Sequence, residues 1–262
     1  MNQRIDLAEL LKAKKVSRKF FQIQPPKQSV RAERDYMRAL KLLITAAARY
    51  TKNVIAPTVE SAQGVNQALD GLKTVIAKVT PNVAEIATRL ISREEIRNRK
   101  EWVSEVKSST GINLAGQLAR DDIQTDFNMI VRRNVALIQG LGDDVRVRIE
   151  RLVTQAVVDG TRPSELEKQL REDFGIVSRR AKLIARDQIQ KANSDLTRIR
   201  QEQCGITHYR WSGVLDSRER PTHKANEGKR FAWAKPPAET GHPGHDVNCR
   251  CVAIALVEIP EE

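Results

Sequence analysis

The side chains best suited to chemistry are concentrated near the C-terminus of this 262-residue chain. Histidine and cysteine bind metals or transfer protons near neutral pH. All four histidines and two of the three cysteines lie beyond residue 207: His208, His223, His242, His245, Cys249 and Cys251. We therefore expect any specific chemistry of the protein to reside in this segment.

Three short motifs carry these residues, separated by loop-like sequence rich in glycine, proline and charge. A loop of about thirty residues inside a compact domain is usually functional or held by specific contacts. The first motif is Asp216-x-Arg218-x-Arg220-x-x-His223, the second is His242-Pro243-Gly244-His245, and the third is Asn248-Cys249-Arg250-Cys251, with Gly228 between the first two.

A structural metal site is one interpretation of this constellation. Cys249 and Cys251 stand two residues apart on an expected strand, so both thiols would point to one face. His223 and either His242 or His245 would complete a tetrahedral Cys2His2 set, the usual closed arrangement of structural zinc. We take His223, His245, Cys249 and Cys251 as the candidate ligands, and expect no other cofactor.

Hydrogen bonding without a metal is a second interpretation, and it remains open beside the first. Asp216 would pair with Arg218, Arg220 or Arg250, and His223 would bridge the loop to the last strand. The two cysteines would then be small buried residues, as free cysteines usually are. A disulfide between them is disfavoured by strain and by a reducing compartment.

Enzymatic activity is a third interpretation. Asp216 and His223 with the flanking arginines would suit phosphodiesterase or nuclease chemistry, and Cys249 with His223 would suit a nucleophile and its base. The sequence has no nucleophile elbow, P-loop, H-E-x-x-H or paired-carboxylate pattern. We therefore predict no enzyme and assign no catalytic residue.

Taken together, the three motifs resemble the C-terminal signature of the phage Mu F-like head morphogenesis proteins, which are minor head proteins of tailed phages. The segment Ile184-Ala185-Arg186-Asp187 resembles the helix before that signature, and the resemblance covers residues 150 to 257. It implies an assembly role with portal, capsid and scaffold proteins as partners, and an influence on DNA packaging or ejection. It also implies a location in the capsid interior, after assembly in the host cytoplasm.

The charge balance favours a polyanionic partner. The formal net charge is +12 and the isoelectric point is near 9.8, which is typical of proteins that meet nucleic acid. Because no DNA-reading motif is present, we expect non-specific contact with the phosphates of double-stranded DNA. The candidate contacts lie in a basic arm that is equally compatible with a loosely ordered terminus: Lys12, Lys14, Lys15, Arg18 and Lys19.

No membrane association is expected. An apolar run of roughly 20 residues is needed to cross a bilayer, and none occurs in the sequence. The N-terminus also lacks the apolar stretch of a secretory signal. We therefore expect synthesis and residence in a cytoplasm.

Helical periodicity dominates the chain from Val30 to residue 203. Apolar residues recur at three- and four-residue spacing, and we expect interruptions at Pro57, Thr80-Pro81, Gly111, Gly140–Gly142, Gly160 and Gly175–Ser178. The helix that follows Pro81 is densely charged and is predicted to be exposed. Alternating aromatic residues predict a strand over 207–214, and a second strand is predicted over 249–257, with none before residue 205.

These elements predict a mainly helical α+β fold. An extended α-helical region, residues 1–160 with the basic arm at 1–29, precedes a small α+β domain at residues 161–262. In that domain, one long helix is expected to pack on a short antiparallel sheet. The Asp/Arg/His loop and the cysteine-bearing last segment must fold against each other if the motifs form one site.

Overall fold

The computed structural model describes residues 5–59, 62–118 and 123–260, and it confirms a mainly α-helical α+β fold. The first four residues of the predicted basic arm and the last two of the predicted C-terminal domain lie outside these ranges. The helices are α1 (Leu7–Ala13), α2 (Val30–Tyr50), α3 (Ala62–Thr110), α4 (Gln124–Asp159), α5 (Pro163–Gln203) and α6 (Pro221–Lys224). The strands are β1 (Phe20–Ile23), β2 (His208–Ser212), β3 (Arg230–Ala232) and β4 (Val252–Glu258).

The chain forms two compact units, each assembled from separate stretches of sequence. Unit 1 comprises Met1–Ser29, Ile91–Ile130 and Asp187–Glu262, and unit 2 comprises Val30–Leu90 and Val131–Arg186. Residue 160, where the sequence predicts a domain boundary, lies in the turn between α4 and α5 within unit 2. Within the described ranges, each helix is either too short or too polar to cross a lipid bilayer.

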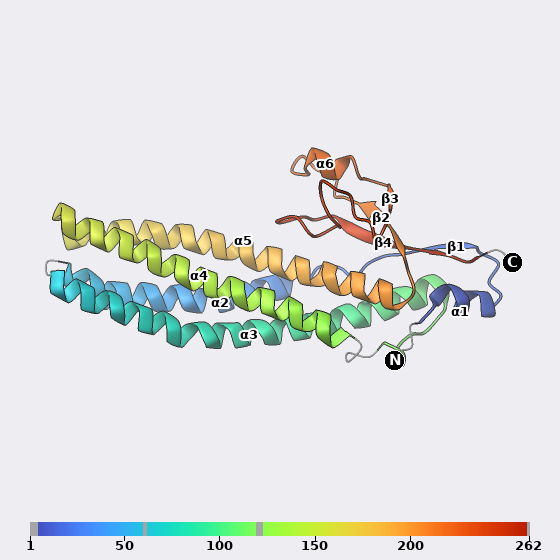
Figure 1. Ribbon diagram of the computed structural model, residues 1–262, viewed down its shortest axis with the longest axis horizontal. Coiled ribbons are helices and arrows are strands. Elements are labelled where there is room, and N and C mark those ends of the chain that lie inside the picture. The colour runs from blue at the N-terminus through green and yellow to red at the C-terminus, as the bar shows by residue number, and fades with distance from the viewer. Residues whose placement is uncertain (1–4, 60–61, 119–122, 261–262) are drawn as a thin grey trace. The chain divides into compact units, whose positions relative to one another are not determined.

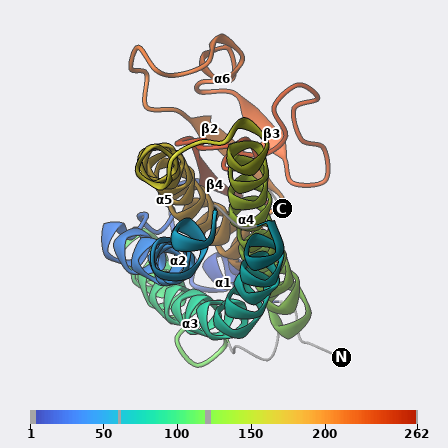
Figure 2. The same ribbon diagram turned by 90° about the vertical axis from the view of Figure 1, so that its left-hand side faces the viewer.

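Unit 2 is a helical bundle. Segments of α2, α3, α4 and α5 lie side by side in it, as both views of the ribbon show (Figures 1 and 2). The predicted apolar stripe of α2 is buried there, including Tyr36, Leu40 and Leu43. The hydroxyl of Tyr36 donates a hydrogen bond of 2.9 Å to Oδ1 of Asn134, so even the polar end of this stripe is satisfied inside the bundle.

Two predicted interruptions in unit 2 are wrong. Thr80-Pro81 lies inside α3, where the hydroxyl of Thr80 donates to the backbone carbonyl of Ile76 at 2.8 Å. Gly142 lies inside α4, and a Cβ at this position would meet Ile76, Thr80 and Leu43 at 3.1 to 3.5 Å. Gly142 therefore serves close approach of helices, and tertiary contact overrides the breaking tendency of glycine.

Other predicted boundaries are partly right. The break at Pro57 is confirmed, because a π-helical turn (Thr51–Ile55) and a 3-10 turn (Ala56–Thr58) follow α2. The turns at Gly111 and Gly160 are confirmed by positive φ angles of 70° and 64°. The predicted break at Gly175–Ser178 is wrong, since α5 runs through it as one helix and buries Leu170, Val177 and Ala181 along its length.

Unit 1 is built around a four-stranded antiparallel sheet with strand order β1-β4-β2-β3. The register places Tyr209 opposite Ala255 and Trp211 opposite Ala253, so these four side chains share one face. The carboxyl end of α5 packs on the sheet, where Gln201 donates to the carbonyl of Ala253 at 3.0 Å. The predicted helix-on-sheet arrangement is therefore confirmed.

The expectation of no strand before residue 205 is wrong, because β1 pairs with β4 along the edge of the sheet. β1 is only four residues long, and its identity depends on a partner more than two hundred residues away. α1 precedes it and begins at Asp6, whose carboxylate accepts hydrogen bonds from the amides of Ala8 and Glu9. The segment from Asp6 to Ile23 is thus ordered by α1 and β1.

The predicted exposure of the charged helix after Pro81 is also wrong over the part of α3 that belongs to unit 1. Glu94, Glu95 and Asn98 are buried. Nη2 of Arg200, on α5, lies 2.5 Å from Oε1 of Glu95, and both side chains have no exposed surface. Part of this charge-rich sequence therefore forms a buried ion pair between α3 and α5.

Candidate functional site

The Asp216–His223 loop closes onto the segment that carries the two cysteines. Asp216 follows β2, and both of its carboxylate oxygens accept hydrogen bonds from Arg250, each at 2.6 Å. Arg218 donates a backbone and a side-chain hydrogen bond to the same carboxylate. The Arg250 guanidinium holds the pKa of the Asp216 carboxyl well below its usual range. A bidentate pair of this kind fixes the loop relative to residue 250.

Arg220, the third arginine considered as a partner of Asp216, has other partners. Arg220 donates to the backbone carbonyl of Val247 at 2.8 Å, and its guanidinium lies 3.9 Å from the carboxylate of Asp246. Asp216 therefore pairs with Arg250 and Arg218, two of the three partners considered from the sequence, and Arg220 secures the opposite side of the loop.

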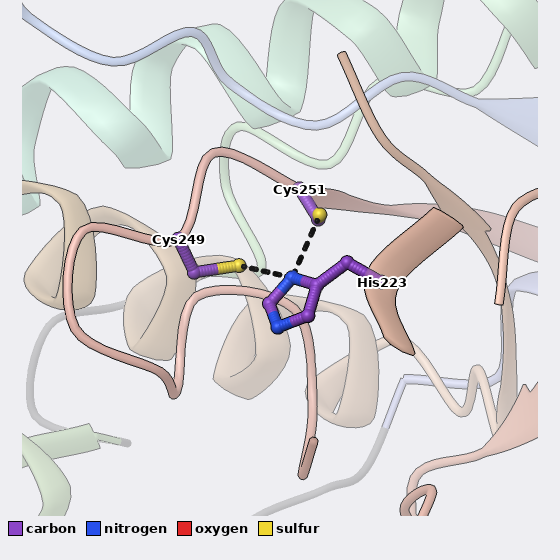
Figure 3. A group of neighbouring side chains, drawn as sticks. All are labelled: His223, Cys249 and Cys251. Atoms are coloured by element: carbon purple, nitrogen blue, oxygen red, sulfur yellow. Dashed lines mark hydrogen bonds between the residues drawn. The ribbon is translucent and has the colours of Figure 1, made fainter. Parts of the chain in front are cut away.

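His223 is directed at both cysteines by the short helix α6. Pro221 begins this helix after an extended Arg220, an arrangement that proline favours at a first helical position. Nδ1 of His223 lies 3.3 Å from Sγ of Cys251 and 3.5 Å from Sγ of Cys249. Figure 3 shows the imidazole facing the two sulfur atoms. All three side chains are buried, at 2% to 3% exposure, so they form one enclosed cluster.

The other ring nitrogen of His223 has an acidic partner. Nε2 lies 2.8 Å from Oδ2 of Asp246. An ionised carboxylate only accepts hydrogen bonds, so the neutral ring that donates to Asp246 from Nε2 has a free lone pair on Nδ1. This is the tautomer that a metal-binding histidine adopts when a carboxylate supports it.

The two thiols differ in acidity. The hydrogen bond from Cys251, with further donation from the Gly244 amide, lowers the pKa of Cys249 to about 6. The same contact with Cys249, reinforced by burial, raises the pKa of Cys251. By contrast, burial raises the pKa of the remote Cys204 to about 11, against the opposing effects of Trp102 and Arg200. Cys249 is thus the thiol that its surroundings favour as a thiolate.

The predicted placement of His245 beside the cysteines is wrong. Among the described residues, the potential ligands that come together are His223, Cys249 and Cys251. His245 is exposed, and its ring lies edge-on to His242 at 5.8 Å. His242 is buried elsewhere, with Nδ1 2.9 Å from the hydroxyl of Tyr209. The H-P-G-H motif therefore contributes backbone geometry to the cluster.

That backbone geometry depends on Gly244. Its φ is 90°, a region that side-chain-bearing residues rarely adopt, and a Cβ there would lie 2.2 Å from Oγ of Ser194 on α5. The preceding Pro243 is buried. Because the amide of Gly244 donates to Sγ of Cys249 at 3.3 Å, this tight turn delivers a hydrogen bond to the sulfur.

Two further motif residues shape the surrounding loops. Gly228 has a φ of 72°, and its amide donates to the carbonyl of Trp211, so it turns the chain from α6 into β3. Asn248 has a φ of 53°, and its amide donates to Oδ1 of Asp187 at 2.7 Å. Asp187 belongs to the Ile184–Asp187 stretch, so this carboxylate ties α5 to the turn before Cys249.

The predicted final strand begins later than expected. β4 starts at Val252, so Cys249 and Cys251 occupy the turn that leads into the strand. Their thiols nevertheless face one histidine. The sequence was expected to bring the two thiols together by placing them two residues apart on one strand. In the structure, the turn and the Arg250–Asp216 ion pair bring them together instead.

Three acidic residues were not assigned a role from the sequence: Asp187, Glu219 and Asp246. Asp246 holds His223, and Asp187 holds Asn248. Glu219 lies with Oε1 3.3 Å from Sγ of Cys251. Their only sequence signal is proximity to a motif, since Glu219 stands inside the Asp216–His223 segment and Asp246 follows His245.

The nuclease interpretation pairs Asp216 with His223, but the structure gives these two residues different partners. Its carboxylate is engaged by Arg250 and Arg218, and the carboxylate on His223 comes from Asp246. The residues that do align are Cys249, His223 and Asp246, in the order thiol, imidazole and carboxylate.

Lys12 lies in the last turn of α1, and the other four basic residues of the arm lie in the connection between α1 and β1. Lys14, Lys15, Arg18 and Lys19 are exposed and Lys12 is half-buried. Lys14 donates to the backbone carbonyl of Gly111, and the guanidinium of Arg18 lies over the ring of Phe21. Among the residues that the structure describes, none of these five cations forms an ion pair with a carboxylate.

Comparison with known proteins places this cluster in a family context. An uncharacterized protein of Haemophilus influenzae is 33% identical over 275 residues, which cover 98% of this chain and 60% of that protein. The chain therefore spans about 60% of the length of this curated relative. Comparison with the solved structures found no match. Residues 147–254 match the family described as phage Mu protein F like protein. Over this segment, which contains the whole cluster, the chain is similar to the phage Mu protein F like family.

Proposed function

We propose that this chain acts as a phage minor head protein, in capsid assembly and in DNA packaging or ejection. The observation that carries the proposal is the family match over residues 147–254, the segment in which Asp216, His223 and the cysteines form one interlocked cluster. A role in the head corresponds to a location in the virion, reached after assembly in the host cytoplasm.

The proposed docking partners are the portal protein and the inner face of the capsid or its scaffold. Docking would use exposed apolar side chains on the helices of unit 2. Val147 and Val158 on α4 are 51% and 76% exposed, and Leu183 on α5 is 54% exposed. Exposed apolar residues on helices are the groups that a protein partner would bury.

Co-purification tests this docking. The full chain would be co-expressed with the portal protein of the same phage or prophage, and with procapsids, and then isolated through the portal. We expect this chain to co-purify, and the double substitution Val158→Lys and Leu183→Lys to abolish its recovery. The matched control is Val214→Lys with Val247→Lys, which adds the same charge at exposed valines of unit 1. Absence of the wild-type chain from portal and procapsid fractions would overturn the proposal.

Non-specific contact with packaged DNA is the second part of the proposed role. Five of the eight residues from Lys12 to Lys19 are cationic and none is acidic. Many other arginines of the chain lie beside carboxylates, as Arg148 and Arg180 do with Asp144. Cations without such partners are the ones available to phosphates, and their binding releases counterions.

Salt dependence of DNA affinity tests this contact. A plot of log affinity against log salt concentration should be linear, with a slope of about −0.9 for each phosphate neutralised. The substitutions Lys12→Gln, Lys15→Gln and Lys19→Gln should make the slope shallower by roughly 2 to 3. The control triple, Lys41→Gln, Lys52→Gln and Lys78→Gln, changes net charge equally on exposed helix positions of unit 2. Equal slopes for the two triples would remove the arm from the DNA contact.

We propose a structural rather than a catalytic role for the aligned Cys249, His223 and Asp246. The thiol of Cys249 is 3% exposed and His223 is 2% exposed, whereas a nucleophilic cysteine must be reached by its substrate. Alkylation of the folded chain with iodoacetamide should therefore leave Cys249 unmodified. Rapid, selective modification of Cys249 in the folded protein would instead support an enzyme.

A further inference from the structure

We propose that His223, Cys249, Cys251 and Glu219 bind one zinc ion. The proposal concerns a metal site and is independent of the proposed role in the phage head. Its ligand atoms are Nδ1 of His223, the two sulfur atoms and a carboxylate oxygen of Glu219. Asp246 acts as the hydrogen-bonding support of His223 and does not touch the ion.

The spacing of the three buried ligand atoms matches a tetrahedral zinc site. Zinc binds sulfur at about 2.3 Å and imidazole nitrogen at about 2.0–2.1 Å, so a tetrahedron has nitrogen–sulfur edges of about 3.6 Å. The observed separations from Nδ1 of His223 are 3.3 Å and 3.5 Å. All three atoms lie within 4.8 Å of one another, which also accommodates a sulfur–sulfur edge of about 3.8 Å.

Hydrogen bonding leaves these groups with competing partners, whereas a metal ion would engage all of them together. Nδ1 of His223 offers one lone pair, because Nε2 carries the proton that is donated to Asp246. Two thiols approach that single lone pair, at 3.3 Å and 3.5 Å, and only one thiol proton can occupy it. The thiol of Cys251 can direct its proton elsewhere, since its Sγ also lies 3.3 Å from Oε1 of Glu219. A metal ion would instead take an electron pair from the nitrogen and from both sulfurs at one centre.

Neighbouring groups prepare the ligands for a cation. Asp246 orients the imidazole, as carboxylates do behind zinc-bound histidines. The amide of Gly244 donates to the sulfur of Cys249, which stabilises a thiolate. Arg250, between the cysteines, is committed to Asp216 at 2.6 Å, so its positive charge is neutralised beside the site.

Glu219 is assigned as the fourth ligand because its carboxylate contacts Cys251, although its oxygens are not among the three ligand atoms that already lie within 4.8 Å of one another. Its Oε1 lies 3.3 Å from Sγ of Cys251, close to the sulfur–oxygen edge of about 3.6 Å expected around zinc. Gly213 creates the room for this side chain, because a Cβ at Gly213 would lie 1.9 Å from Oε1 of Glu219. A cleft of about 20 Å³ opens between Glu219, His223 and the two cysteines, and roughly 10–15 Å³ suffices for one small guest.

The donor set selects the metal. Two thiolates and one imidazole in tetrahedral spacing are typical of zinc, whereas calcium and magnesium require oxygen ligands. The ion would join three separate stretches of unit 1, namely the loop after β2, α6 and the turn before β4. Its role would thus be to hold the interlocked loops together.

Metal content is the first test. The full chain, purified without chelators, should contain about one zinc per chain by elemental analysis. Cys249→Ser and Cys251→Ser should each reduce zinc at least tenfold. Cys204→Ser is the matched control, because Cys204 is a buried free cysteine in a separate apolar cluster of unit 1. Zinc below one tenth of an equivalent in the folded wild type, even after incubation with zinc salt, would overturn the proposal.

Ligand identity is the second test. X-ray absorption at the zinc edge should show two sulfur and two nitrogen or oxygen ligands, in the wild type and in His245→Gln alike. Glu219→Gln should weaken zinc affinity, measured by competition with a chromophoric chelator, and Asp246→Asn should weaken it by about 10- to 100-fold. A loss of zinc in His245→Gln, with Glu219→Gln unaffected, would overturn the assignment of the fourth ligand.

If the cysteine variants fail to fold, the wild-type protein can still test the proposal through its thermal stability. Chelation of the wild-type protein should lower its melting temperature, and added zinc should restore it. Cys204→Ser should respond in the same way. A melting temperature that is indifferent to chelator and to zinc would show that any metal found is adventitious, which also overturns the proposal.

Discussion

Arg250 donates two hydrogen bonds of 2.6 Å to the two carboxylate oxygens of Asp216, across thirty-four positions of sequence. Arg250 is the residue between Cys249 and Cys251, so this pair fixes the direction in which both thiols point. On the opposite side, Asp187 holds the amide of Asn248 at 2.7 Å. The cysteine turn is therefore fastened at both ends to other parts of unit 1.

Substitution of Asp216 by Asn should loosen this turn without unfolding the protein. Asn cannot provide two charged oxygens to Arg250, and the pair is partly exposed, so the effect is local. We expect backbone amide exchange over residues 247–252 to accelerate by roughly two- to fivefold in the chelator-treated protein. Hydrogen exchange followed by mass spectrometry measures this. Arg218→Gln is the control, since it leaves the Asp216–Arg250 pair in place, and equal exchange in all three proteins would contradict the expectation.

The association of the three motifs was predictable from residue type. The Asp216–His223 segment carries acids that can pair with Arg250, and both segments carry metal-binding side chains. The sequence of β2 alternates as strands do, and that of β4 is a short apolar run. These signals are local, since alternation and motif spacing need no knowledge of the partner. The structure brings His223 to both cysteines, as the metal and hydrogen-bond interpretations each require.

The acidic members of the cluster were not predictable. The chain has 33 Asp and Glu residues, and a motif-adjacent acid looks like any solvated one. Whether Asp246 or Asp216 contacts His223 depends on loop paths that no local pattern encodes. The same limitation explains the wrong choice of His245, because spacing alone does not show that Gly244, at a φ of 90°, turns this ring away.

Helix boundaries and burial failed for a related reason. Gly142 and Pro81 carry the usual signals of interruption, yet both lie inside long helices whose packing stabilises them. Glu95 lies in a pattern typical of an exposed helix, and only the arrival of Arg200 on another helix makes it buried. Tertiary partners decide these cases, and they are distant in sequence.

Removing either member of the Glu95–Arg200 pair should destabilise the protein strongly. Both side chains have no exposed surface, and burial lowers the pKa of Arg200 against the opposing influence of Glu95. Arg200→Met removes the nearest cation from a buried carboxylate and leaves it with Arg99, whose Nε lies 3.8 Å from Oε1 of Glu95. Loss of a buried charge's partner costs up to about 3–5 kcal/mol of the free energy of unfolding. Urea denaturation of the full chain measures the loss.

The double substitution Glu95→Leu with Arg200→Met provides the decisive comparison. It removes both charges, so most of the stability lost in Arg200→Met should return. The control is Arg89→Met, whose partner Glu85 is exposed, and which should change stability by about 0–1 kcal/mol. If the double variant were no more stable than Arg200→Met, the loss would come from packing and not from an unpaired charge.

Gly244→Ala should destabilise unit 1 and release the sulfur of Cys249 from its amide donor. The substitution introduces a Cβ at a φ of 90°, and that atom would meet Oγ of Ser194 at 2.2 Å. We expect a loss of about 2–3 kcal/mol in the free energy of unfolding, combining backbone strain with the steric clash. Denaturant titration measures it.

A matched glycine separates this effect from a general cost of replacing glycine. Gly140→Ala lies within α4, where a Cβ would meet nothing within 4 Å. It should be neutral or slightly stabilising, by up to about 1 kcal/mol, because alanine favours helix. Gly244→Ala with no greater cost than Gly140→Ala would show that the turn tolerates a side chain.

His242 should make stability depend on pH in the mildly acidic range. Its Nδ1 lies 2.9 Å from the hydroxyl of Tyr209, and burial lowers its pKa from 6.5 to about 4, with the charges of Arg198 and His245 acting in the same direction. The folded state therefore resists protonation of this ring. In the unfolded chain the ring accepts a proton near pH 6.5, so the unfolded state binds more protons between these two values.

Stability from this group is thus complete above pH 6.5 and is lost as pH falls towards 4. We expect the contribution to be on the order of 1–3 kcal/mol, measured as the difference in the free energy of unfolding between pH 7 and pH 4.5. Chelator-treated protein should be used, so that proton competition at the cysteine cluster does not contribute. His242→Gln should flatten the pH dependence by that amount. An identical slope in His242→Gln and the wild type would show that His242 is protonated as easily in the folded protein as in the unfolded chain.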